Sequence, residues 1–191
     1  MGDTSVKIDL PNLNGIINAM GKVKGLTAKV GVTDPGVARY AAYVEFGWVQ
    51  RVTGKQAGWM RAQGVSVPPG ATLHSPPRPI FHATAQGHSK EWCAVARNAW
   101  KQGAPLAAGN AAQKAVKALE TAAVAAQNEV VNTIATGGAA YGFPKRSPLT
   151  MALYAALNKG HKAGGGNTST GKPLALSGRL LASIGYQMTK G

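Results

Sequence analysis

The segment that comes nearest to a known binding motif is 166–172, Gly-Asn-Thr-Ser-Thr-Gly-Lys. It matches the first seven positions of the phosphate-binding loop, in which backbone N–H groups and a lysine hold phosphates. The eighth position, where a hydroxyl would bind magnesium, is Pro173. The residues before the motif are polar and glycine-rich rather than an apolar strand, and no Asp or Glu follows Glu129. We therefore expect no nucleotide or other cofactor to bind here.

The remaining reactive side chains form no catalytic or metal-binding pattern. Zinc sites bring His and Cys together at short fixed spacings, and the histidines do not follow such a spacing; they are His74, His82, His88 and His161. Cys93 is the only cysteine, so no intrachain disulfide can form. It lies near His88 and Glu91 but in no nucleophile motif, and its apolar helical surroundings predict a buried, inert thiol. The sequence therefore predicts neither an enzyme nor a metal site.

The charge of the chain is strongly positive. Among 191 residues, 21 Lys and Arg face seven Asp and Glu, a net charge of +14. Such a field attracts a polyanion or an acidic partner surface, although a basic protein without a specific partner has the same composition. No base-reading motif is visible, so any DNA would bind to the basic surface through its phosphates, without recognition of its sequence. The candidates for contact with DNA or a partner are Lys145, Arg146, Lys159, Lys162 and Lys172.

The composition also limits the setting in which the chain acts. No stretch is long and apolar enough to span a membrane, and no apolar signal region is visible. With one cysteine, the chain is expected in a reducing compartment, or on a particle assembled in one.

The first part of the chain predicts strands and helices in alternation. Residues 5–10 are a short strand candidate, 11–23 a helix and 26–33 a half-buried strand. Asp34-Pro35-Gly36 then opens a helix that Gly47 ends. Glu45 lies in the last turn, where the helix dipole disfavours a carboxylate, so a cationic partner is expected, and Arg78 is the candidate.

The middle of the chain contains a long connection. Residues 49–52 predict a strand, and 53–77 follow as a segment rich in Gly and Pro. A connection of this length is usually functional or mobile. Two alternatives remain open, a β-ribbon arm that grips a neighbouring subunit and a surface loop. Trp59, Met60 and Arg61 are the candidate subunit-interface residues in it.

The second half of the chain is mainly helical. Pro79 suits the start of a helix over 80–101. A long alanine-rich core helix is expected at 106–136 and a shorter one at 148–158. A flexible loop at 160–172, a helical turn at 177–183 and a strand at 184–188 complete the pattern. We expect one α+β domain over 1–191, with a small mixed sheet from the strands near Leu26, Val49 and Ile184.

Several short strings occur in an order that resembles one family, the tail-completion or neck proteins of tailed double-stranded-DNA phages. These minor tail proteins typically show a strand, a helix ending in a Glu-Phe-Gly-like triplet, a Pro-Pro-Arg-Pro helix start and a closing Thr-Gly-x-Leu, Ser-Ile series. The corresponding strings here are Val30-Gly31-Val32, Glu45-Phe46-Gly47, Pro76-Pro77-Arg78-Pro79-Ile80-Phe81, Pro173-Leu174, Ser177-Gly178-Arg179-Leu180 and Ser183-Ile184. Ile80 stands where Phe often follows the proline, and Ser177 where Thr is usual.

The resemblance implies a structural virion protein and not an enzyme. Such a subunit forms a homo-oligomeric ring, usually of six copies, assembled in the host cytoplasm. The ring completes the tail and joins it to the head, in contact with the connector and with tube or terminator proteins, while DNA passes through its channel. One alternative is a tail terminator that stops polymerisation of the tube. Another is a free basic protein that binds DNA without sequence preference.

Overall fold

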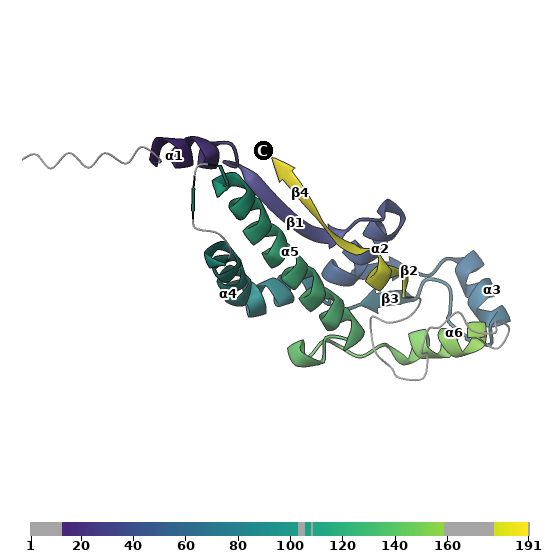
Figure 1. Cartoon of the computed structure of the whole chain (residues 1–191). Helices are drawn as coiled ribbons and strands as arrows, with labels where there is room; N and C mark the ends of the chain where they lie inside the picture. The colour runs from purple at the N-terminus through teal and green to yellow at the C-terminus, as the bar shows by residue number, and fades with distance from the viewer. Residues whose placement is uncertain (1–12, 103–105, 108, 159–177, 191) are drawn as a thin grey trace, which may run out of the picture. The chain divides into compact units, whose positions relative to one another are not determined.

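The computed structural model describes residues 13–102, 106–107, 109–158 and 178–190 (Figure 1). The described part combines helices with two small sheets, so the predicted α+β class is confirmed. In chain order its elements are α1 (Leu13–Gly21), β1 (Leu26–Val32), α2 (Pro35–Phe46), β2 (Trp48–Arg51), α3 (Gly54–Ala62), β3 (Thr72–Ser75), α4 (Ile80–Lys101), α5 (Ala111–Ala135), the 3-10 helix η1 (Ala139–Tyr141), α6 (Pro148–Asn158), α7 (Arg179–Ala182) and β4 (Ile184–Lys190).

The chain divides into two compact units. One contains the described parts of Met1–Lys29, Lys90–Ala125 and Tyr186–Gly191, and the other those of Val30–Ser89 and Ala126–Gly185. The long elements α4 and α5 each contribute residues to both units. Because the division follows no single point in the sequence, the one domain expected over 1–191 stays a prediction. We call the unit that contains Val30–Ser89 the second unit.

The expected single mixed sheet is wrong. β1 pairs with β4, whereas β2 pairs antiparallel with β3, with Trp48 opposite Ser75 and Arg51 opposite Thr72. The strands near Leu26 and Ile184 therefore share one sheet, as expected, but the one near Val49 is in another. Its partner β3 has only four residues, which is too short for an alternating pattern to be recognised in the sequence.

The connection over residues 53–77 contains a helix and a strand that the sequence did not predict. It contains α3 and β3, and β2 and β3 form a two-stranded ribbon. Thr53 begins α3 with a capping box, in which its hydroxyl accepts from the Gln56 N–H and the Gln56 side chain accepts from the Thr53 N–H. Only one strand of the ribbon, β3, lies in the connection, so the choice between a β-ribbon arm that grips a neighbouring subunit and a surface loop stays a prediction.

Most helix predictions agree closely with the structure. The bounds of α4 and α6 are those expected, and α5 lies inside the predicted 106–136. Asp34 caps α2, since its Oδ1 accepts a hydrogen bond of 2.8 Å from the Gly36 N–H, and Pro35 occupies the first turn. The strand expected at 5–10 and the loop expected at 160–172 lie outside the described residues. No helix of the described part is both long and apolar enough to cross a membrane.

The hydrophobic core of the second unit joins four helices and a strand. Three of its side chains come from one face of α2, and α4, α5, α7 and β4 supply the others; they are Val37, Ala41, Val44, Ile80, Val130, Ile134, Leu180 and Ile184. Burial of each large aliphatic side chain contributes about 1.5–3 kcal/mol. The core therefore fixes the end of α2 against the beginning of α4.

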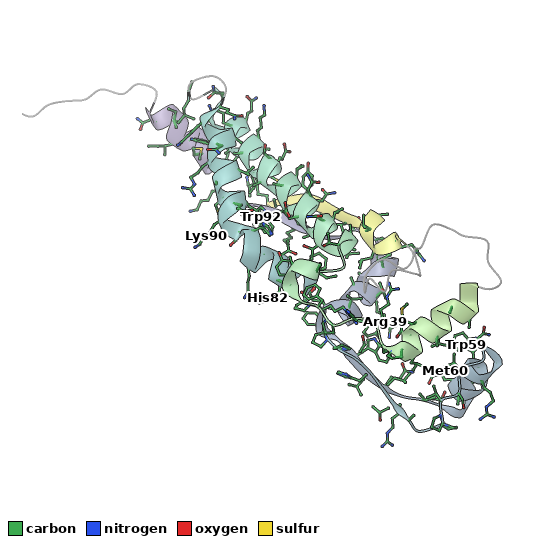
Figure 2. The ribbon with its side chains drawn as sticks, turned by 90° about the horizontal axis from the view of Figure 1, so that it is seen from below. Arg39, Trp59, Met60, His82, Lys90 and Trp92 are labelled. Carbon is green, nitrogen blue, oxygen red and sulfur yellow. The ribbon has the colours of Figure 1, made fainter. Side chains whose placement is uncertain are left out.

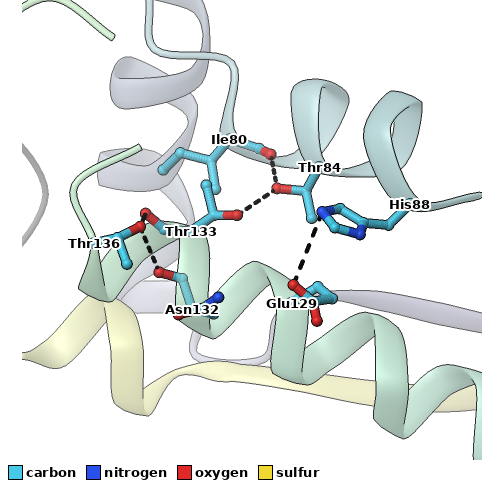
Figure 3. Close-up of polar contacts among 7 residues, drawn as sticks. All are labelled: Ile80, Thr84, His88, Glu129, Asn132, Thr133 and Thr136. Carbon is cyan, nitrogen blue, oxygen red and sulfur yellow. Dashed lines mark hydrogen bonds and ion pairs between the residues drawn. The ribbon is translucent and has the colours of Figure 1, made fainter. Parts of the chain in front are cut away.

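A pair of threonines connects α4 to α5 inside this core (Figure 3). Thr84 and Thr133 are 0% and 5% exposed, and their Oγ1 atoms lie 2.9 Å apart. The Thr84 hydroxyl also donates to the Ile80 carbonyl at 2.7 Å. Because a hydroxyl has one hydrogen to donate, Thr133 is the donor to Thr84.

We predict that Thr84→Val destabilises the protein by about 1–3 kcal/mol, because the buried Thr133 hydroxyl loses its acceptor. Urea unfolding followed by circular dichroism measures the change. Thr121→Val is the matched control, since Thr121 makes the same kind of bond to the Lys117 carbonyl on an exposed helix face. Equal losses in the two variants would contradict a special role for the buried pair.

Candidate functional site

The end of α2 and the beginning of α4 cross in backbone contact. The Arg78 N–H donates to the Val44 carbonyl at 2.8 Å. Gly47, directly after α2, has φ +73°, which favours glycine. A Cβ at Gly47 would lie 2.6 Å from the Ser75 carbonyl oxygen and 2.8 Å from the Pro77 nitrogen. Glycine is therefore required at this position both by its φ and by the neighbouring backbone.

Glu45 caps α4 although it belongs to α2. Its Oε2 accepts from the Phe81 N–H at 3.1 Å and its Oε1 from the His82 N–H at 3.2 Å. The first N–H groups of a helix have no partner within the helix, and Pro79, just before α4, has no side-chain oxygen to offer them. The buried carboxylate of Glu45 fills this role from another helix. The positive end of the α4 dipole also compensates for its unfavourable place at the end of α2.

The expected ion pair between Glu45 and Arg78 is wrong. The Arg78 guanidinium donates from Nε to the Pro144 carbonyl at 2.9 Å and from Nη2 to the Lys145 carbonyl at 3.2 Å. Its Nη1 lies 3.5 Å from the Ser75 hydroxyl. The fork of the guanidinium thus holds the segment that leads into α6. We call Glu45, Gly47 and Arg78 the clamp.

A groove borders the clamp on the second unit. It has a volume of about 670 Å³ and is lined by residues of α2, β2, α3, β3 and the beginning of α6. Its apolar lining includes Val44, Trp48, Met60, Leu73, Leu149 and Leu153. Two arginines, Arg78 and Arg146, also line it, and no Asp or Glu among the described residues does. The groove therefore combines an apolar surface with positive charge.

α2, β2 and α3 each carry exposed apolar side chains. Phe46 is 78% exposed, Val49 66% and Trp59 48%, and Tyr40 and Tyr43 are also exposed. Arg39 packs over the ring of Tyr43, with its Cζ 5.7 Å from the ring centre, and donates to the Tyr43 hydroxyl at 3.0 Å. Tyr40, Tyr43 and Val49 line the groove as well. We call these five apolar residues the exposed apolar surface.

The three candidate interface residues of α3 do not share one environment. Figure 2 shows Trp59 and Met60 next to each other on this helix. Trp59 and Arg61 are exposed, whereas Met60 is buried and lines the groove. Successive helix positions are about 100° apart, so neighbouring residues cannot all face the same way. Their contact with another subunit stays a prediction.

The other candidate residues are distributed over the second unit. Pro79 and Phe81 are half-buried, and Phe81 packs on the core that contains Leu180. Gly178 precedes α7 with φ +67°. Lys145 is exposed and Arg146 half-buried. The candidates Ser177, Lys159, Lys162 and Lys172 lie outside the described residues.

The structure corrects one prediction about reactive side chains. Cys93 is exposed, not buried, because it lies beside and not within the half-buried stripe of Trp92, Val95 and Ala96 on α4. His74 and His82 are exposed, and His88 is half-buried. Within the ranges that the structure describes, no three His, Cys, Asp or Glu residues lie close enough together to hold a metal ion.

No local sequence pattern indicates the groove. Its lining comes from segments more than a hundred residues apart in the chain, from Tyr40 to Leu153. Comparison of the chain with protein-family models, curated proteins and solved structures gives no match. The clamp, the groove and the exposed apolar surface are therefore the features that bear on function.

We predict that Gly47→Ala destabilises the protein by more than about 1 kcal/mol, because alanine disfavours this φ and its Cβ meets backbone atoms. Gly58→Ala is the control, since Gly58 lies within α3 with nothing near its Cβ position and should gain roughly 0.5–1 kcal/mol. Thermal unfolding of the two variants measures the difference. Similar melting temperatures would contradict the crossing described for Gly47.

We also predict that Glu45→Ala lowers the unfolding free energy by about 1–3 kcal/mol, since two N–H groups of α4 lose their acceptor. Glu45→Gln should lose less, because an amide oxygen still accepts, although more weakly than a carboxylate. Denaturant titration gives both values, with Glu120→Ala, a carboxylate on α5, as control. An unfolding free energy unchanged by Glu45→Ala would contradict the capping role.

Proposed function

We propose that this chain is a structural subunit of a phage virion, located at the neck or at the end of the tail. Copies of it form a ring that completes the tail and joins it to the head, and DNA passes through the channel. The proposal extends the resemblance carried by Glu45-Phe46-Gly47 and by Pro76-Pro77-Arg78-Pro79. In the structure these two strings contact each other, because they contain the three residues of the clamp.

The observation that carries the proposal is the exposed apolar surface. Isolated exposed apolar side chains are common, but a group of aromatic residues on adjoining elements is typical of a protein–protein interface. Phe46 is the most exposed of them and lies between two residues of fixed geometry, Glu45 and Gly47. The clamp thus presents the Phe46 ring on a rigid support, which is what a repeated subunit contact requires.

The charge of the chain supports the same proposal. Each copy has a net charge of +14, and a ring of about six copies would concentrate this charge around its channel. Such a field attracts a polyanion without reading its sequence. A tail terminator would have the same ring, exposed apolar surface and charge. Tail completion and tail termination are therefore distinguished by the particles that form when the protein is absent.

Electron microscopy of particles assembled without this protein tests the proposed place in the virion. Tails of normal length that fail to attach to heads would support tail completion. Overlong tails would show a terminator instead. Complete, infectious particles would contradict both.

We predict that Phe46→Ser prevents ring formation without unfolding the subunit, because substitution of so exposed a side chain changes stability by only about 0.5 kcal/mol. Light scattering after size-exclusion chromatography measures the mass of the assembly. Val124→Ser, which removes an exposed apolar side chain of α5, should leave the ring intact. A monomeric wild-type protein that binds any DNA duplex with strong salt dependence would favour the free DNA-binding alternative.

A further inference from the structure

We propose that the outer face of α3 binds single-stranded nucleic acid, with cations of this region on its phosphates and Trp59 stacked on one of its bases. The site is separate from the groove, to which α3 contributes Gln56 and Met60. It is also separate from the subunit contact assigned to Phe46. The inference goes beyond the proposed virion function and does not require it.

Trp59 and Lys55 lie next to each other on the outer face of α3 (Figure 2 labels Trp59). Ala57 and Met60 are 3% and 6% exposed, so they mark the side of this helix that faces the protein. Lys55 and Trp59 are four positions apart on the other side, and residues at this spacing are neighbours on a helix surface. Trp59 is 48% exposed, and nothing lies within 4 Å of the Cβ position at Gly58. A planar ligand can therefore reach the Trp59 ring beside a cation.

The region around Trp59 carries positive charge without an acidic counterpart. Arg51, Lys55 and Arg61 are all exposed, and no Asp or Glu occurs between residues 46 and 90. In the part of the chain that the structure describes, no carboxylate forms an ion pair with any of these three cations. Exposed cations of this kind attract a polyanion.

The acids of the second unit are engaged elsewhere. They are Asp34, Glu45 and Glu129. Asp34 caps α2, Glu45 caps α4, and the carboxylate of Glu129 lies 3.9 Å from the His88 ring. The charge on α3 is therefore left for an anion from outside the unit.

Charge and the aromatic ring together select the occupant. A second copy of the chain has the same excess of positive charge and would be repelled. An acidic protein would compensate the charge, but its carboxylates would not use the face of the Trp59 ring. A duplex offers phosphates, but its bases are already stacked and paired. Only a single strand offers phosphates to the cations and an unpaired base to the ring.

Binding of an oligonucleotide to the full chain tests the inference directly. The probe is a fluorescein-labelled oligothymidine of about 12 nucleotides, which is within the range of sites that bind single strands. Fluorescence anisotropy should show binding that weakens steeply with added salt and is tighter than that of a labelled duplex of equal length. Absence of binding, or tighter binding of the duplex, would overturn the inference.

Substitution of Trp59 tests the stacked base. Trp59→Ala should weaken binding of the single strand about tenfold, because a stacked base is lost, and should change binding of the duplex little. Trp59→Phe should keep most of the affinity. Tyr186→Ala, which removes an exposed aromatic ring from β4, is the control and should bind as the wild type does. Wild-type affinity of Trp59→Ala for the single strand would overturn the inference.

Substitution of the cations tests the phosphate contacts. Lys55→Gln and Arg61→Gln should each reduce the slope of log K against log salt by roughly 0.7, because one phosphate contact is lost. Lys117→Gln, at an exposed position of α5, should leave the slope unchanged. An unchanged slope in both α3 variants would overturn the site. Displacement of the strand by polyglutamate as readily as by unlabelled oligothymidine would indicate an acidic protein partner and would also overturn it.

Tryptophan fluorescence gives a measurement at the proposed ring itself. The chain has four tryptophans, so the difference between the wild type and Trp59→Phe reports Trp59. A stacked base quenches the fluorescence of an indole ring, and the single strand should therefore quench the wild type more than this variant. Equal quenching in the two proteins would overturn the inference.

The mass of the assembly separates this inference from the proposed function. Trp59→Ala should have the same mass by light scattering as the wild type, because the subunit contact is assigned to Phe46. Loss of a wild-type ring in Trp59→Ala would make Trp59 a subunit contact and would overturn the inference. Stacking on Trp59 in a wild-type protein that stays monomeric would support the inference and contradict the proposed ring alone.

Discussion

The capping of α4 by Glu45 is the interaction on which the arrangement of the second unit depends. A helix that begins after proline, without a capping side chain of its own, leaves N–H groups that must find an acceptor. Glu45 supplies it from the last turn of α2, where its own helix disfavours a carboxylate. Each helix end is therefore unfavourable alone, and together they compensate each other. This requirement fixes the contact between α2 and α4 more specifically than apolar packing would.

The other clamp residues extend this constraint in two directions. Gly47 lets the backbone after α2 pass against Ser75 and Pro77, so the end of β3 is held at the same point. Arg78 reaches the carbonyls of Pro144 and Lys145 and so positions the chain before α6. Elements far apart in the sequence are thereby held against one short stretch of backbone. Glu45, Gly47 and Arg78 are therefore required for the structure, although none of them has catalytic chemistry.

Sequence patterns were sufficient where the signal was local. Pro79 and Pro148 mark the beginnings of α4 and α6, and the apolar spacing of Val130 and Ile134 placed α5 in the core. Sequence patterns did not predict α3 or β3. α3 contains two glycines and only a weak apolar stripe, and β3 has four residues, which is too short for a pattern to be recognised. Charge alone predicts a cationic partner for Glu45, and this prediction is wrong. The start of α4 has no capping side chain of its own in the sequence, and this absence indicates that its backbone N–H groups need an acceptor from elsewhere.

The clamp also connects the groove to the exposed apolar surface. Val44 and Arg78 both line the groove, and the Arg78 N–H donates a hydrogen bond to the Val44 carbonyl. This bond holds the end of α2 next to the start of α4. Phe46 stands between Glu45 and Gly47 on the same turn and faces solvent. The exposed Phe46 and the groove-lining Val44 thus belong to the same end of α2, which the Glu45 cap and the backbone hydrogen bond from Arg78 fix against the start of α4. A contact residue on a fixed support loses less conformational entropy on association than one on a mobile segment. The clamp therefore favours association through Phe46, because it restricts this segment of backbone before any partner binds.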